Sequence, residues 1–343
     1  MATATYTSPG QRRGIILGQI LKHAVFRQTV EITGERWKQP VGMGDTVIFR
    51  QVVPFGASAS APNTFSVTAA SHLMQEGQNP TAESLSVLDF TVTVQKYGAL
   101  YSYTERQKSL GEDPIPDWMT GQVGERLGLV REKIYVAALQ GCTNRFFSGG
   151  TARGTVSLTV TLNLMDRITR NLKGNHAEYV REVAKSSQLE GAVSLQPAFA
   201  NFAHTDAQRD IENIQGYKAV ADYGTAKPIH DLEVGAVGSH RFILSADMPF
   251  FADAGAAVGA TGLKTTSASN VDVYQMFTIA KNAWGHTAFR GLDAVDFSHI
   301  PVNQKDKSDP TGERGYVSGT FYDAGLVTNH GWMAVSEFGV TNL

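Results

Sequence analysis

The sequence predicts an α+β fold with an N-terminal arm, a long β-arm, one long helix and a mixed body. Three observations predict it. Two stretches of alternating apolar and polar residues flank a segment of small polar residues, 54–85. A pattern with helical spacing covers 117–141, and most of the remaining apolar stretches have the length and alternation of β-strands. No internal repeat is visible.

The composition restricts the classes of function. The chain has 343 residues, which allows one or two domains. Charged residues make up 18% of it, below the usual share of about 25%, and the net charge is −2. A dedicated nucleic-acid-binding protein would show clustered Lys and Arg. The single cysteine, Cys142, excludes an intramolecular disulfide and a multi-cysteine metal site, and we interpret it as a small buried residue.

The N-terminal arm carries an amphipathic pattern. Residues 14–28 predict a helix whose apolar side would face another subunit or the chain's own body, with a membrane surface as the weaker alternative. Arg12 and Arg13, together with Lys22 and Arg27, form a modest basic arm. It is interpreted as solvated, as part of a charge set between subunits, or as a contact to phosphates. No apolar run reaches the roughly 18 residues that a membrane helix requires.

The β-arm follows. Asp45–Val53 predicts one strand, and Leu88–Arg106 predicts a strand pair or one long strand. The segment Pro54–Leu85 between them contains no Lys or Arg. Because two strands alone are marginal in water, the arm must rest on its own domain or on a neighbouring subunit. The residues by themselves leave both alternatives open.

One long helix is predicted over 117–141, with Asp117 as its N-cap and Gly141 as its end. Gly121, Gly124 and Gly128 interrupt it. Each glycine costs about 1 kcal/mol relative to alanine inside a helix. We interpret them either as places where another backbone approaches or as residues that a well-packed helix tolerates.

The body alternates between helices and strands. A helix is expected over 162–173, and Thr205 with Gln208 indicates a capping box at the start of a short helix. The residues Asp309-Pro310-Thr311-Gly312 have the chemistry of a type I turn. Strands are expected at 192–202, 241–245, 271–280 and 287–290, and the chain ends in β-rich segments from 315 onwards.

No arrangement of residues predicts catalysis, a metal site or a cofactor. His204 lies near Asp206 and His230 lies beside Asp231, but we interpret both pairs as solvated residues near turns. Glu76 and Glu83 form a candidate carboxylate pair without any sign that they converge. The sequence contains no phosphate-binding loop and no nucleophile elbow. We therefore expect no enzyme.

Local motifs resemble a known family. Residues 197–230 place a short helix with Asp-Ile after an apolar strand that ends near a His, and then a Tyr-Gly turn. The runs 233–237 and 241–245 and the element 309–317 add further similarity. Together these motifs resemble the major capsid proteins of N4-like tailed phages, which have the HK97-type (Hong Kong 97-type) capsid fold. The resemblance covers about 88–343 and is weakest in the first 85 residues. Thr311 and Glu313 depart from the family pattern.

The resemblance implies a domain organisation. Residues 1–44 would form the N-terminal arm and 45–106 the extended E-loop. Residues 107–195 would form the P-domain, with 117–141 as its spine helix. The A-domain would cover 196–290, and 291–343 would return to close the P-domain.

The resemblance also implies a function and partners. The chain would assemble into the hexamers and pentamers of an icosahedral virion shell around double-stranded DNA, in the host cytoplasm. Its partners would be further copies of itself, a portal, and decoration proteins. Because Met1 is present, any scaffold is expected to be a separate chain. Packaged DNA would be contacted weakly, through Arg12 and Arg13. The alternatives are a host-encoded nanocompartment shell of the same fold and a β-rich hydrolase.

Overall fold

We analysed a computed structural model of the chain. It describes residues 27–40, 42, 44–55, 57, 62–65, 67–74, 76, 84–110, 115–180, 197–223, 228–259, 262–292, 294–305 and 309–343. The predicted helix 14–28, apart from its last two residues, lies outside these ranges, as do Arg12, Arg13 and Glu83.

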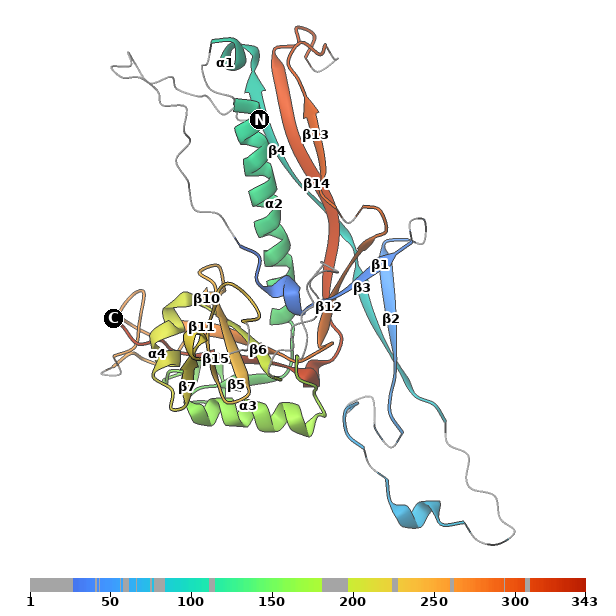
Figure 1. Ribbon diagram of the computed structural model, residues 1–343, viewed down its shortest axis with the longest axis vertical. Helices are drawn as coiled ribbons and strands as arrows, with labels where there is room; N and C mark the ends of the chain where they lie inside the picture. Colours follow the sequence, from blue (N-terminus) through green and yellow to red (C-terminus); the bar gives the residue numbers. More distant parts are fainter. Residues whose placement is uncertain are drawn as a thin grey trace.

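The molecule consists of three parts (Figure 1). A long helix, α2 (Ile115–Gln140), stands against a set of long strands. A sheet domain lies at the lower end of this helix, and a ribbon of two strands projects away from both. A short helix, α1 (Glu105–Leu110), precedes α2.

Helix α2 confirms the predicted long helix but not its predicted cap. The helix begins at Ile115, so Asp117 lies in its first turn and is not the N-cap. Pro116 is tolerated there because the N–H groups of a first turn have no partner within the helix. At the other end, the N–H of Gly141 bonds to the carbonyl of Ala138, and the helix ends at Gln140.

The face of α2 that carries Val123, Leu127 and Tyr135 is buried against β14 (Arg314–Val327). Two glycines on this strand allow the contact. A Cβ on Gly319 would lie 2.7 Å from the side chain of Leu127, and a Cβ on Gly325 would lie 2.9 Å from Ala138. The close approach between helix and sheet therefore depends on glycines of the strand. The glycines within α2 do not meet another backbone within 4 Å.

Strand β14 organises a five-stranded sheet. It pairs antiparallel with β4 (Gln95–Thr104), β12 (Trp284–Phe289) and β13 (Asp296–Ile300). The fifth strand, β1 (Glu35–Gln39), pairs parallel with β12. The turn predicted at Asp309 is present, since the N–H of Gly312 bonds to the carbonyl of Asp309. It lies just before β14.

Two tryptophans fix β1 to β12. A Cβ on Gly285 would lie 2.2 Å from the Trp37 ring, and a Cβ on Gly34 would lie 2.6 Å from the Trp284 ring. Each indole therefore covers a glycine of the other segment. The indole N–H of Trp284 also donates to the hydroxyl of Thr33, at 3.1 Å.

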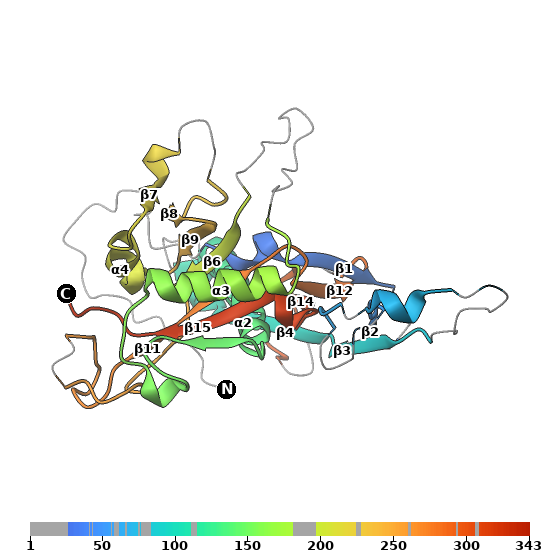
Figure 2. The ribbon, with the colours of Figure 1, turned by 90° about the horizontal axis from the view of Figure 1, so that it is seen from below.

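The second sheet has eight strands and is covered on both faces. Helix α3 (Leu162–Gly174) lies across one face (Figure 2), and the lower end of α2 packs on the other. Its central strand, β11 (Val273–Ile279), is buried along its whole length for this reason. The other strands are β5 (Arg145–Phe147), β6 (Phe199–Ala203), β7 (Tyr217–Ala219), β8 (Glu233–Val237), β9 (His240–Leu244), β10 (Phe250–Phe251) and β15 (Met333–Phe338).

The start of α4 (Gln208–Glu212) differs from the prediction. A 3-10 turn, Thr205–Ala207, precedes this helix. The cap of that turn is His204, whose Nδ1 accepts the N–H of Asp206 at 3.0 Å. The predicted capping box of Thr205 and Gln208 is therefore wrong, because the imidazole occupies the capping position.

We predict that Gly285→Ala destabilises the subunit by about 1–3 kcal/mol, because the new methyl group would overpack against Trp37 and the Glu35 carbonyl. Gly174→Ala is the matched control, since a Cβ there would have no heavy atom within 4 Å. The free energy of unfolding in urea measures both. Equal values for the two variants would contradict the role given to the Trp37–Gly285 contact.

Candidate interaction surface

The ribbon is a two-stranded antiparallel sheet of β2 (Thr46–Val52) and β3 (Val87–Thr93). Neither strand pairs with a third strand in the part of the chain that the structure describes. The strand is interrupted at Val94, and the chain continues as β4 in the five-stranded sheet. The predicted 88–106 stretch is therefore a strand pair, and its two halves belong to different sheets.

The two faces of the ribbon differ. One face is half-buried, and on it Phe49 lies directly opposite Phe90. The Trp37 ring packs on Phe49 with 4.5 Å between the ring centroids. This contact joins the root of the ribbon to β1, and so to the body of the molecule.

The other face is exposed and partly apolar. Ile48 is 61% exposed and Val52 is 54% exposed, and Val87 lies opposite Val52. Between them, Arg50 and Asp89 form a bidentate ion pair at 2.7 and 2.8 Å. An exposed pair of this kind contributes little stability, so the ribbon lacks a core of its own.

Large apolar side chains are also exposed beyond the two strands. They are Phe55, Phe65, Val67, Leu73, Met74 and Leu85. Scattered single apolar residues are ordinary on a protein surface, but a contiguous group indicates a contact with another molecule. These side chains all belong to the segment 54–85, whose only charged residues are Glu76 and Glu83.

A groove of about 670 Å³ runs between α2 and the root of the ribbon. Its lining is mainly apolar and includes Leu129, Val130 and Ile134. The exposed cations Arg126 and Lys133 also line it. The molecule thus presents an apolar ribbon with an acidic outer segment and an apolar groove bordered by positive charge.

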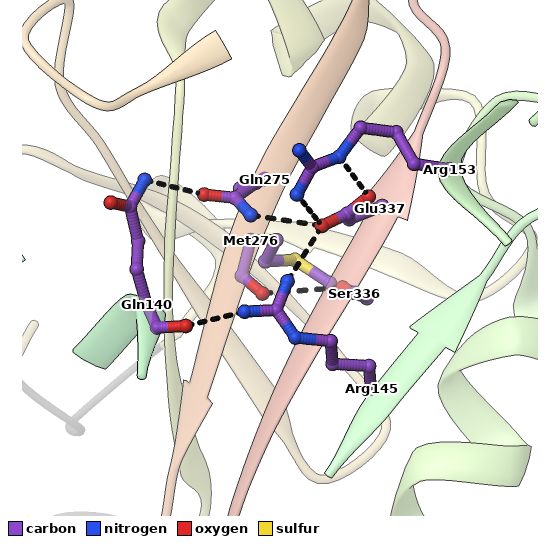
Figure 3. Close-up of polar contacts among 7 residues, drawn as sticks. All are labelled: Gln140, Arg145, Arg153, Gln275, Met276, Ser336 and Glu337. Atoms are coloured by element: carbon purple, nitrogen blue, oxygen red, sulfur yellow. Dashed lines mark hydrogen bonds and ion pairs between the residues drawn. The ribbon is translucent and has the colours of Figure 1, made fainter. Parts of the chain in front are cut away.

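The most extensive buried polar network surrounds Glu337 on β15 (Figure 3). Its carboxylate accepts hydrogen bonds from Arg145 at 3.0 Å, from Arg153 at 2.7 and 2.8 Å, and from Gln275 at 2.9 Å. Gln140, at the end of α2, donates to Gln275. Burial opposes ionisation of Glu337, but these donors outweigh it and hold its pKa below the ordinary value. The network ties the end of α2 to β5, β11 and β15 of the eight-stranded sheet.

A second buried network joins α2 to the five-stranded sheet. The Tyr135 hydroxyl donates to Asp323 at 2.7 Å and lies 3.0 Å from His286 Nδ1. Arg131 lies 3.1 Å from the same carboxylate. Burial raises the pKa of Asp323 to about 6 and lowers that of His286 to about 4. The carboxylates at the centre of the two networks, Glu337 and Asp323, are buried, and we assign both networks a structural role.

The residues considered as candidate sites are separate from one another. His204 packs against Tyr274 and lies 3.5 Å from Asp206, so it is largely buried and not solvated as expected. His230 contacts the Gln28 carbonyl, while Asp231 is exposed. Cys142 is buried as predicted, and burial raises the pKa of its thiol.

Within the described ranges, no group of three or more His, Cys, Asp or Glu is arranged to hold a metal ion. None of the helices in this part of the chain is both apolar and long enough to cross a membrane. The sequence did not single out Trp37, Glu337 or Asn329. For Trp37, the available signal in the sequence was a tryptophan next to a strand. For Glu337, it was a single acidic residue within an apolar strand.

Comparison with solved structures identifies the fold. The chain is similar to one in the head structure of Helicobacter pylori bacteriophage KHP40, with a TM-score of 0.64, 10% identity and 95% of each chain covered. It is similar to the capsid of Ralstonia phage GP4, with a TM-score of 0.65, 13% identity and 99% of each chain covered. The capsid asymmetric unit of cyanophage Pam1 matches over 100% of each chain, with a TM-score of 0.59 and 13% identity.

No protein-family profile matches the chain, and no curated protein matches it in sequence. The structural matches nevertheless cover nearly the whole chain. The chain therefore has the α+β, HK97-type fold of tailed-phage capsid proteins, as the sequence predicted.

The buried acid and imidazole of the second network predict opposite effects of pH. The pKa of Asp323 is raised on folding from 3.8 to about 6, so its contribution to stability falls as the pH rises between these values. The pKa of His286 is lowered from 6.5 to about 4, so its contribution rises with pH over nearly the same range. In the natural chain the two effects largely cancel.

We predict that Asp323→Asn removes this cancellation. The variant should lose about 2 kcal/mol more than the natural subunit when the pH falls from 7 to 4.5. Urea unfolding at the two pH values measures the difference, with the exposed Asp296→Asn as the control. An unchanged pH dependence in Asp323→Asn would contradict the assignment.

Proposed function

We propose that this chain is the major capsid protein of a tailed phage. Its copies assemble into the hexamers and pentamers of an icosahedral virion shell that encloses double-stranded DNA. The observation that carries the proposal is the ribbon of β2 and β3, which pairs with no third strand among the described residues and exposes Ile48, Val52 and Val87. The similarity of fold to phage head and capsid structures supports it.

The proposed domain organisation follows the order of the chain. Residues 1–44 form the N-terminal arm, and 45–106 form the E-loop, with β4 as the strand that fastens it to the body. The P-domain covers 107–195 and 291–343 and contains α2 as the spine helix. The A-domain covers 196–290. The pairing of β4, β13 and β14 beside α2 supports the P-domain part of this division. The two sheets cross its bounds elsewhere, since β12 joins β14 while β5 and β15 belong to the eight-stranded sheet.

We propose that the E-loop rests on a second copy of the chain. Burial of its apolar side chains would contribute about 25 cal/mol for each Å² removed from water. The groove beside α2 has the chemistry to receive it, because its lining is apolar and Arg126 and Lys133 would face the acid-only segment 54–85. Many such contacts, each weak, would stabilise a closed shell.

The membership of the N4-like family is part of the same proposal and rests on the motifs in 197–230, 233–245 and 309–317. A portal and separate scaffolding or decoration proteins would be further partners. Contact with packaged DNA would be weak and non-specific, involving Arg12 and Arg13. A net charge of −2 is consistent with a lining that does not hold DNA tightly.

The test is assembly of the expressed chain. Electron microscopy should show closed shells or hexameric capsomers, while a solution of monomers would count against the proposal. If the chain forms shells but its gene lies in a host genome without DNA-packaging genes nearby, the nanocompartment would be favoured instead.

We predict that removal of residues 58–79 leaves a soluble subunit that does not form shells, since Val67, Leu73 and Met74 in this segment are exposed and would be buried by a partner. Ile48→Ser with Val52→Ser should have the same effect on the exposed face of the ribbon. Thr91→Ser, on the same face, is the control. Sedimentation and electron microscopy measure assembly, and normal shells from the deletion would refute the E-loop assignment.

We also predict that the shell contains no lysine-based covalent cross-link. The outer E-loop lacks lysine, and the first lysine after it, Lys96, lies on β4 with its ammonium 5.5 Å from the centre of the Tyr322 ring. Boiled particles should therefore run as single subunits on a denaturing gel. A ladder of cross-linked subunits, confirmed by mass spectrometry, would overturn this prediction.

A further inference from the structure

The outer part of the arm returns to the body of its own subunit. Residues 62–65 follow β2 along the chain and lie between the ribbon and the sheet domain (Figure 1). There the side-chain amides of Asn63 and Asn329 form a reciprocal pair. Each amide nitrogen donates to the oxygen of the other at 2.8 Å. These residues are separated by 266 positions in the chain.

The body is shaped to receive Asn63. Asn329 is buried, and its oxygen also accepts the N–H of Gly331 at 3.0 Å, which holds the amide in position. A Cβ on Gly331 would lie 2.2 Å from the amide nitrogen of Asn63, so only glycine leaves room. Next to this pair, the Phe65 ring contacts His176 edge-on, with 4.9 Å between centroids.

A cavity of about 490 Å³ lies beside this contact. The arm contributes Gln51, Leu88 and Phe90 to its wall, and the body contributes Asn144 and Asn175. Both asparagines of the body already bond to Asn171, so their amides are not directed toward a ligand. The cavity is therefore the space between the ribbon and the body.

The arm is thus fastened to the body by two chemically different contacts. The root contact of Trp37 on Phe49 is aromatic and apolar. The outer contact depends on two hydrogen bonds between neutral amides, and water can replace such bonds at little net loss. Near the root, Gly42 and Gly44 have φ of +92° and +87° and no heavy atom within 4 Å of a Cβ position.

We propose that the Asn63–Asn329 pair, together with the Phe65–His176 contact, is a releasable brace that fixes the angle between the arm and its own subunit. When the brace opens, the arm turns about its root while the Trp37–Phe49 contact persists. The consequence for assembly rests on the proposed function. A subunit whose arm angle is adjustable can reach neighbours in both five-fold and six-fold rings.

The test measures the arm angle in the unassembled subunit, so its result does not depend on whether shells form. Spin labels are placed at Leu73→Cys on the arm and Lys173→Cys on α3, both of which are exposed. The buried Cys142 is not expected to react. Pulsed electron paramagnetic resonance then gives the distribution of distances between the labels.

We expect one narrow distribution in the natural background. Asn63→Ala with Asn329→Ala should broaden it and shift it, while Asn163→Ala, an exposed asparagine on α3, should leave it unchanged. Labels at Lys173→Cys and Lys218→Cys, both on the body, should give the same distance in every variant and so report that the body remains folded.

Two results would overturn the proposal. One is a distribution in the double variant that matches the natural one, because the amide pair would then not hold the arm. The other is a natural distribution that is already as broad as that of the double variant, because the brace would then not be closed in solution.

Discussion

Helix α2 lies close to β14 because two glycines of that strand leave room for side chains of the helix. Leu127 occupies the space over Gly319, and Ala138 occupies the space over Gly325. The contact positions a rod of 26 residues along a strand of 14 residues. Since β14 also pairs with β4, β12 and β13, most of the five-stranded sheet depends on this one packing arrangement. A larger side chain at either glycine would separate the helix from the sheet.

The same arrangement determines where the arm leaves the molecule. Strand β4 is held along its full length by β14, and the chain before Val94 belongs to the ribbon. Trp37 then holds the root of the ribbon through Phe49 while it covers Gly285 on β12. A rigid sheet, an aromatic root and a polar outer contact therefore follow one another along the arm.

The elements that depend on local pattern were predictable from the sequence. The long helix, the helix α3 and the strands β9, β11 and β15 follow from the spacing of their apolar residues. The predictions that were wrong concern features that depend on contacts between residues far apart in the chain. The capping position before α4 belongs to His204, whose ring is held by Tyr274, 70 residues further along. The glycines of α2 were candidates for the close approach of another backbone, but the glycines that allow the helix to approach the sheet are on β14.

At the candidate interaction surface, too, local composition was predictive, while contacts between distant residues were not. The segment 54–85 was recognisable from its composition, because small polar residues without Lys or Arg cannot build a core. The amide pair of Asn63 and Asn329 was not recognisable, because nothing in either local sequence indicates a partner 266 residues away. The register of the two sheets could not be predicted for the same reason, because it is set by pairing between segments that are far apart in the chain.

The pairing of β4 with β14 also sets the order in which the chain can fold during synthesis. Strand β4 ends at Thr104, and its partner does not begin until Arg314. Throughout the translation of the intervening residues, β4 and the apolar arm before it lack the strand that fixes them. Such exposed strand edges are prone to aggregate. The fixing of β4 in a newly made chain therefore waits for the synthesis of Arg314–Val327.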